Sequence, residues 1–146
     1  MLSFDTNILV YATDMDDVQR QRRAVDLLAS AAKVGAGLTE QALIEFINVS
    51  MKKTKAPLDK TRHVLRRWLE SFRLLTPGPS IVTDVLELLA KHRLSAWDAR
   101  LLAVCAKSGC AVLISEDLQD GAKYAGVRVL NPFNAANADN IAELLA

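Results

Sequence analysis

The chain contains the apolar run Ala111-Val112-Leu113-Ile114, which leads directly into the polar turn Ser115-Glu116-Asp117. Four apolar residues in succession, bounded by a turn, indicate a short strand that is covered on both faces. Strands of this kind are typical of parallel sheets, in which the connecting helices lie on both faces. We therefore expect an α/β protein with acidic side chains where this strand ends.

Strands and helices alternate along the rest of the chain. Further strands are expected near residues 2–4, 34–38, 74–75 and 127–130. Helices are expected to begin after the capping residues Asp5, Asp16 or Asp17, Thr39, Asp59, Ser80 and Ser95, with a weaker helix near 138–145. This alternation predicts a three-layer α/β/α sandwich with a short, mostly parallel central sheet. Without a repeat or a linker, residues 1–146 are expected to form a single domain.

Composition narrows the class of protein further. The chain has 146 residues, of which 51% are hydrophobic and 24% charged, enough for one buried core. No apolar run approaches the roughly 18 residues of a membrane span, and the acidic residue Asp5 comes too early for a signal peptide. Cys105 and Cys110 fit reduced thiols better than a disulfide framework. We expect a soluble, cytoplasmic protein that does not interact with membranes.

The net charge of +1 conceals an uneven distribution. The segment Lys52–Arg73 carries eight basic and two acidic residues, a charge of +6, which leaves −5 for the remainder. Within it, Arg62, Arg66 and Arg67 lie off the apolar stripe formed by Val64, Leu65, Trp68, Leu69 and Phe72. The segment is either a surface that binds a polyanion or a solvated helix face.

Three acidic positions are expected at one edge of the sheet. Asp5 follows the first strand and Asp117 follows the strand at 111–114, while Asp98 lies in the first turn of the helix after Ser95. In open parallel sheets, ligands bind beyond the carboxyl ends of the strands. Topology therefore places the three carboxylates at one rim, although each is individually explained as a cap or a turn residue.

Asp98 is the most informative of these residues. It shares a helix face with Leu101, Leu102 and Cys105, whereas Arg100, Ala103 and Lys107 are expected on the opposite face. An ionised carboxylate on an apolar face is costly unless something compensates it. A capping box with Ser95 and a bound metal ion are the two alternatives.

Glu45 is less distinctive. It shares the polar face of its helix with Gln41 and Asn48, so that a solvated glutamate is the simplest interpretation from periodicity. If several carboxylates do meet, their repulsion favours a divalent cation, and oxygen ligands select Mg²⁺ or Mn²⁺. His63 and His92 have no partner at zinc spacing.

The motifs, taken together, resemble those of PIN-domain ribonucleases over essentially the whole chain. The resemblance rests on Asp5-Thr6-Asn7-Ile8-Leu9-Val10-Tyr11-Ala12, Gln41-Ala42-Leu43-Ile44-Glu45-Phe46, Trp97-Asp98-Ala99, residues 113–121 and Val129-Leu130-Asn131-Pro132-Phe133. Each motif alone is weak, but all occur in the order of the family. The similarity is greatest to the VapC-like toxins of bacterial toxin–antitoxin pairs.

This resemblance implies a metal-dependent endoribonuclease that acts on RNA, usually as a homodimer, and is inhibited by a VapB-like antitoxin. It assigns the catalytic and Mg²⁺- or Mn²⁺-binding carboxylates to Asp5, Glu45, Asp98 and Asp117. Asn7 and Ser115 are expected to support them or to contact the substrate, and Arg62, Arg66 and Arg67 to contact phosphates. Glu116 and Asp120 crowd the same turn, and Asp117 is preferred because it matches the family's Ser/Thr-x-Asp pattern.

Two other functions are consistent with the same residues. A catalytically degenerate PIN-like domain would serve only as an RNA- or protein-binding module. An aspartyl phosphohydrolase would use Asp5 as its nucleophile, but such enzymes typically have a second aspartate where Asn7 stands. A small DNA-binding antitoxin encoded directly upstream would favour the ribonuclease.

Overall fold

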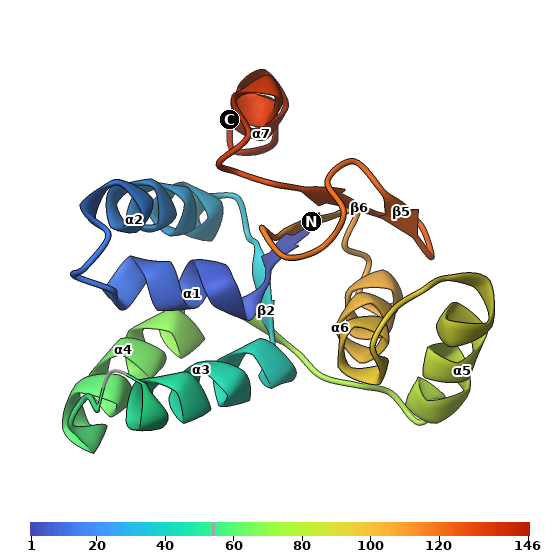
Figure 1. The fold of residues 1–146 in the computed structure, drawn as a ribbon, viewed down its shortest axis with the longest axis horizontal. Helices are drawn as coiled ribbons and strands as arrows, with labels where there is room; N and C mark the ends of the chain where they lie inside the picture. Colours follow the sequence, from blue (N-terminus) through green and yellow to red (C-terminus); the bar gives the residue numbers. More distant parts are fainter. Residues whose placement is uncertain (54) are drawn as a thin grey trace.

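A computed structural model describes residues 1–53 and 55–146, and its described part contains a sheet of six strands (Figure 1). The strand order is β3-β2-β1-β4-β6-β5. Adjacent strands are parallel except for β5, which pairs with β6 in the antiparallel sense. The strands are β1 (Leu2–Phe4), β2 (Gly37–Thr39), β3 (Arg73–Leu75), β4 (Val112–Ile114), β5 (Lys123–Tyr124) and β6 (Val127–Leu130).

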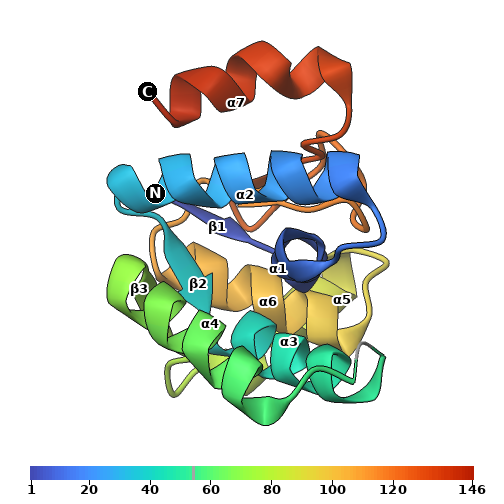
Figure 2. The ribbon, with the colours of Figure 1, turned by 90° about the vertical axis from the view of Figure 1, so that its left-hand side faces the viewer.

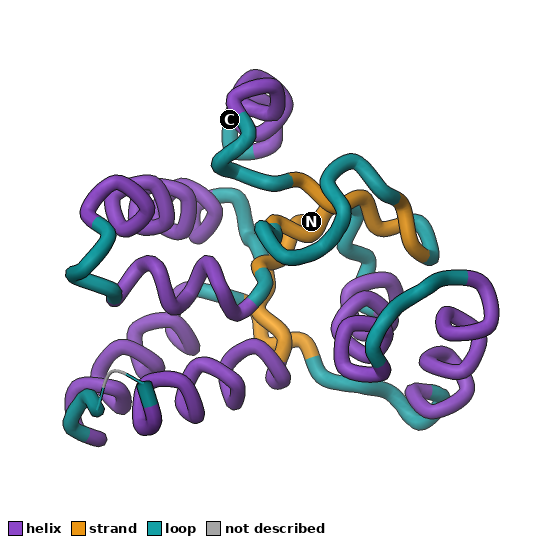
Figure 3. Tube along the Cα trace, viewed as in Figure 1, coloured by secondary structure: helices purple, strands orange, loops and turns teal. Residues whose placement is uncertain are grey.

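Helices cover both faces of this sheet, as the tube view makes plain (Figure 3). They are α1 (Thr6–Thr13), α2 (Val18–Lys33), α3 (Glu40–Lys52), α4 (Leu58–Ser71), α5 (Ile81–Lys91), α6 (Ala96–Lys107) and α7 (Ala138–Leu144), with a short 3₁₀ helix at Ala135–Asn137. Helices α1 to α4 lie on one side, with α7 beyond α2, and α5 and α6 lie on the other (Figures 1 and 2). The predicted three-layer architecture with a mostly parallel sheet is confirmed.

Strand β4 illustrates how the two apolar cores are built. Val112 and Ile114 belong to the core beneath α1, α2 and α3, whereas Leu113 between them belongs to the core beneath α5 and α6. Successive side chains of a strand point to opposite faces, so a strand buried on both faces must be apolar throughout. The apolar run in the sequence has this physical cause.

Local capping chemistry starts four of the helices where the sequence predicts, and α1 begins after the cap Asp5. The side chains of Asp17, Thr39 and Ser95 each accept a backbone N–H bond, with donor–acceptor distances of 3.1 Å. Two other predictions differ in detail. Helix α5 begins directly after Ser80 as predicted, but the Ser80 hydroxyl donates to Asp84 at 2.7 Å instead of accepting a backbone N–H. Helix α4 begins at Leu58, one residue before the predicted Asp59.

Tertiary packing accounts for the remaining differences. Strand β2 begins at Gly37, later than expected, and the two-residue strand β5 was not predicted. Ala103, expected on a polar face, is buried because α5 packs against α6. Leu69, expected in the apolar stripe of α4, is 52% exposed.

Two further features complete the description. Cys105 and Cys110 are both buried, free thiols. Among the described residues, no helix is long and apolar enough to cross a membrane.

Candidate active site

Asp5 occupies the carboxyl end of β1 and caps α1. Its side chain is buried, its Oδ1 accepts the Thr6 N–H at 2.7 Å, and its Oδ2 accepts the Ser115 hydroxyl at 2.7 Å. Burial raises the pKa of Asp5 to about 6, the two hydrogen bonds oppose this rise, and the charges of Asp117 and Asp98 add to it. The fold therefore holds a carboxylate that is costly to ionise and that is affected by the charges of two further carboxylates.

Asp98 approaches Asp5 from the first turn of α6. The Ser95 hydroxyl accepts the Asp98 backbone N–H at 3.1 Å, which is one half of a capping box. The reciprocal half is missing, because the Asp98 carboxylate makes no hydrogen bond to any residue that the structure describes. The half-buried carboxylate is therefore not used as a cap, which was one of the two alternatives for this residue.

Glu45 is brought to the same region by α3. Its Oε2 accepts the hydroxyl of Thr6 at 2.7 Å, and its Oε1 accepts the side-chain N–H of Gln41 at 3.0 Å. The side chain is half-buried, and the part of the polar face formed by Gln41 and Glu45 contacts α1 and α6, whereas Asn48 is exposed. The simplest interpretation from periodicity, a solvated glutamate, is therefore wrong.

A polar chain behind Glu45 joins α3 to α6. Gln41 also donates to the Trp97 carbonyl at 3.0 Å, and its own side-chain oxygen accepts from Arg100 at 2.9 Å. Arg100 in turn forms an ion pair with Glu40 at 3.0 Å. Sequence reasoning missed the roles of Thr6, Gln41 and Arg100, because each partner lies on a different element. The motif that includes Gln41 was the one available signal.

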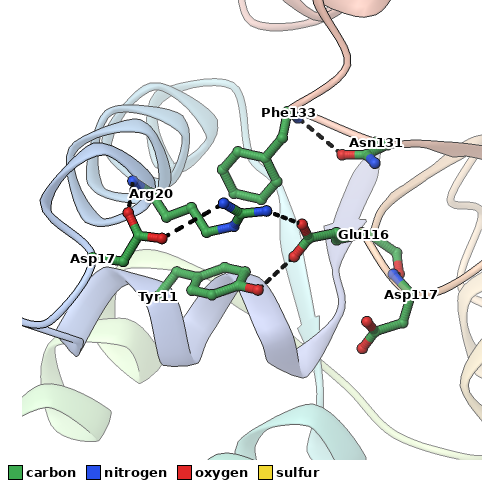
Figure 4. A network of polar contacts seen from close by, with 8 residues as sticks. Tyr11, Asp17, Arg20, Glu116, Asp117, Asn131 and Phe133 are labelled. Atoms are coloured by element: carbon green, nitrogen blue, oxygen red, sulfur yellow. Dashed lines mark hydrogen bonds and ion pairs between the residues drawn. The ribbon is translucent and has the colours of Figure 1, made fainter.

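The structure gives the three crowded acids of the loop after β4 three different surroundings. Glu116 accepts hydrogen bonds from Tyr11 and Arg20 (Figure 4). Asp120 instead accepts from the Asn131 backbone at 2.9 Å and from the side chains of Asn134 and Asn137 at 2.7 and 2.8 Å. These bonds lower the pKa of Asp120, the Asn131 N–H contributing most. Only the exposed Asp117 side chain, of the three, has no hydrogen bond within the described part of the chain.

The remaining predicted residues divide into two groups. Ser115 contacts the acidic side chains directly, through its hydrogen bond to Asp5. Both polar atoms of the Asn7 amide are buried and unpaired with any described residue. Arg62, Arg66 and Arg67 are exposed on α4, and none of the contacts among described residues connects them to the acidic side chains. The structure therefore does not place these arginines in the site itself.

The donor set has the chemistry that a hard divalent cation requires. Its ligand atoms are carboxylate oxygens, the type preferred by Mg²⁺ and Mn²⁺. Within residues 1–53 and 55–146, however, no three His, Cys, Asp or Glu side chains are already gathered as metal ligands. Ion binding would therefore require these carboxylates to move closer together.

Fold and site together define an α/β protein with an acidic group at the carboxyl edge of a parallel sheet. Within that class, the chain belongs to the PIN-domain family, whose model matches residues 3–126. No curated protein matches the sequence closely. The resemblance to PIN domains found in the sequence is confirmed.

Solved structures with the same fold include components of toxin–antitoxin systems. One is VapBC2 from Rickettsia felis bound to a promoter DNA fragment, at 16% identity and TM-score 0.64, covering 89% of this chain and 97% of that chain. Another is VapC20 of Mycobacterium tuberculosis, a sarcin–ricin loop cleaving toxin, at 18% identity and TM-score 0.65, covering 80% and 90%. A toxin–antitoxin complex from Klebsiella pneumoniae shares 22% identity at TM-score 0.62, covering 91% and 98%. At these identities, the similarity concerns the fold.

Proposed function

We propose that this chain is a metal-dependent endoribonuclease and the toxin of a VapBC-type toxin–antitoxin pair. One observation carries the proposal: Asp5 is buried, its pKa is raised to about 6, and the negative charges of Asp117 and Asp98 contribute to that rise. An uncompensated arrangement of this kind costs stability, and it is retained where carboxylates have a function. Membership of the PIN family and the folds of the VapC toxins support the same conclusion.

Asp5, Asp98 and Asp117 would hold Mg²⁺ or Mn²⁺, with Glu45 as a further ligand or as the group that orients water. Such an ion lowers the pKa of a water molecule and stabilises charge on the scissile phosphate. The oxygen-only donor set suits this role, whereas zinc would favour His or Cys ligands.

The chain's own contacts prepare these carboxylates. The Ser115 hydroxyl and the Thr6 N–H fix the two oxygens of Asp5, at 2.7 Å each. The Thr6 hydroxyl and the Gln41 amide do the same for Glu45. Thr6 therefore ties both carboxylates to one position at the start of α1, which limits the reorganisation needed during the reaction.

RNA would be bound by groups outside the acidic cluster. Both polar atoms of the Asn7 amide are buried and have no partner among the described residues, so Asn7 would contact RNA only after its side chain turned outward. Arg62, Arg66 and Arg67 form an exposed basic surface that we assign to phosphate contacts farther along the strand. Such contacts give affinity without reading the base sequence, which suits single-stranded or looped RNA.

We propose a VapB-like antitoxin and a second copy of the chain as protein partners. A groove between α3 and α4 is lined by Ile47, Leu65, Leu58 and Leu69, of which Leu58 and Leu69 are 53% and 52% exposed. Arg62 and Arg66 line the same groove, so a protein bound there would compete with RNA for these two arginines. Exposed apolar side chains gathered in a groove are typical of protein interfaces. Co-purification with an upstream-encoded antitoxin, and sedimentation of the isolated chain, test the two partners separately.

The activity is tested with purified protein, single-stranded RNA, and Mg²⁺, Mn²⁺ or chelator. Asp5→Asn keeps the shape of the side chain and removes its charge, so we expect cleavage to be abolished while RNA binding is retained. Asp26→Asn, which removes an exposed carboxylate from α2, is the matched control and should cleave normally. Cleavage by Asp5→Asn at the wild-type rate would contradict the assignment. A wild-type protein that binds RNA but never cleaves it would identify the degenerate alternative.

A further inference from the structure

Glu116 and Asp117 are consecutive residues with opposite surroundings. The Asp117 charge acts on Asp5, whereas the Glu116 side chain points toward α1 and α2 (Figure 4). Both side chains leave the same short loop after β4. Specific contacts hold Glu116 on the side of α1 and α2.

Arg20 supplies the main contact. Its Nη2 donates to one oxygen of Glu116, and the hydroxyl of Tyr11 donates to the other, so both oxygens are engaged. The Glu116 side chain is only 20% exposed in this position. On its other side, Nη1 of Arg20 lies 3.5 Å from the carboxylate of Asp17, which also caps α2.

The guanidinium of Arg20 is also held by aromatic rings. Its central carbon lies 4.8 Å from the ring centre of Phe133 and 5.4 Å from that of Tyr11. The Phe133 backbone is fixed in turn by a 2.9 Å hydrogen bond to the Asn131 side chain. A planar cation stacked on rings and bonded to a carboxylate has one well-defined position. The network therefore joins α1, α2, the loop after β4 and the loop after β6.

We propose that Arg20 is a positioning residue of the candidate active site: by holding Glu116 toward α1 and α2, it leaves Asp117 as the loop carboxylate that serves the acidic group. The proposal rests on the proposed nuclease function. Ser115 fixes the other side of the same loop, because its hydroxyl donates to Asp5 and accepts the Asp117 backbone N–H at 3.2 Å. Because Ser115 and Glu116 are both anchored, the Asp117 side chain lies on the side of the loop that points away from Glu116 (Figure 4).

The kinetic test compares Arg20→Met with Arg22→Gln, an exposed arginine of the same helix without a hydrogen bond or ion pair to the described residues. Arg20→Met should lower kcat by about tenfold to a hundredfold, as expected for a small displacement of a reacting group, with little change in KM. Arg22→Gln should match the wild type. Adding Glu116→Gln to Arg20→Met should restore most of the kcat, since no charge then needs to be held. A double variant as slow as Arg20→Met, or a single variant as fast as wild type, would overturn the proposal.

Hydrogen exchange of residues 115–120 tests the same role without using catalysis. We expect faster exchange in Arg20→Met than in wild type or Arg22→Gln. Unchanged exchange would refute the positioning role even if the protein proved not to be a nuclease, while a wild type without RNA cleavage would refute only the proposed function. If Arg20→Met fails to fold, Tyr11→Phe removes one hydroxyl of the same anchor and should accelerate exchange of the same peptide to a smaller extent.

Discussion

Replacing Asp5 with asparagine should make the protein more stable relative to wild type as the pH rises. Asp5 has an ordinary pKa of 3.8 and a value of about 6 in the fold. One pKa unit corresponds to about 1.4 kcal/mol, so ionising Asp5 costs the folded state about 3 kcal/mol at high pH. Asparagine in the same place carries no such cost.

The sign follows from proton binding. Because the raised pKa means that the folded state binds the Asp5 proton more tightly than the unfolded chain, wild type loses stability as the pH rises from about 4 to about 6. About 2 kcal/mol of the difference between Asp5→Asn and wild type should develop between pH 4.5 and pH 8. The substitution also changes the hydrogen bond to Ser115. This change alters the stability of Asp5→Asn by the same amount at both ends of the pH range, so the pH-dependent part of the difference remains.

Urea unfolding of both proteins in chelator, at several pH values, measures this difference. Thermal unfolding should show a relative shift of roughly 4–8 °C over the same range for a domain of this size. Asp26→Asn provides the control, with a stability difference that stays constant over the range. A constant difference for Asp5→Asn as well would refute the claim that Asp5 is held in a costly ionised state.

Three further predictions concern the metal, the basic surface and the sheet. Mg²⁺ at ten times its dissociation constant should stabilise wild type by about 1.4 kcal/mol in calorimetry but give Asp98→Asn little; an equal gain in both would remove Asp98 from the metal site. Replacing Arg62, Arg66 and Arg67 together with glutamine should weaken RNA binding. The slope of log affinity against log salt concentration should become smaller by about one for each phosphate that is no longer neutralised. An unchanged slope would assign the surface to a protein partner. Gly37→Ala should cost about 1–3 kcal/mol in urea unfolding, because its Cβ would lie 2.8 Å from the Leu75 side chain; wild-type stability would mean that Leu75 moves aside freely.

Much of the fold was predictable because its signals are local. A capping side chain such as Thr39 bonds to an N–H three residues ahead, and the apolar strand at Val112–Ile114 records burial on two faces. Asp5 and the loop after β4 were likewise placed at one edge by topology alone, since carboxyl ends of parallel strands meet there.

Contacts between distant segments decided the rest. The sequence offered Glu116, Asp117 and Asp120 within one turn, and only the resemblance to the family's Ser/Thr-x-Asp pattern favoured Asp117. They differ in the fold because Arg20 lies 96 residues before Glu116, and the asparagines that hold Asp120 belong to the segment after β6. Similarly, Glu45 is half-buried and bonded to Thr6, which lies 39 residues earlier on α1. Periodicity describes one element at a time, whereas the surroundings of a carboxylate depend on which elements the chain packs against it.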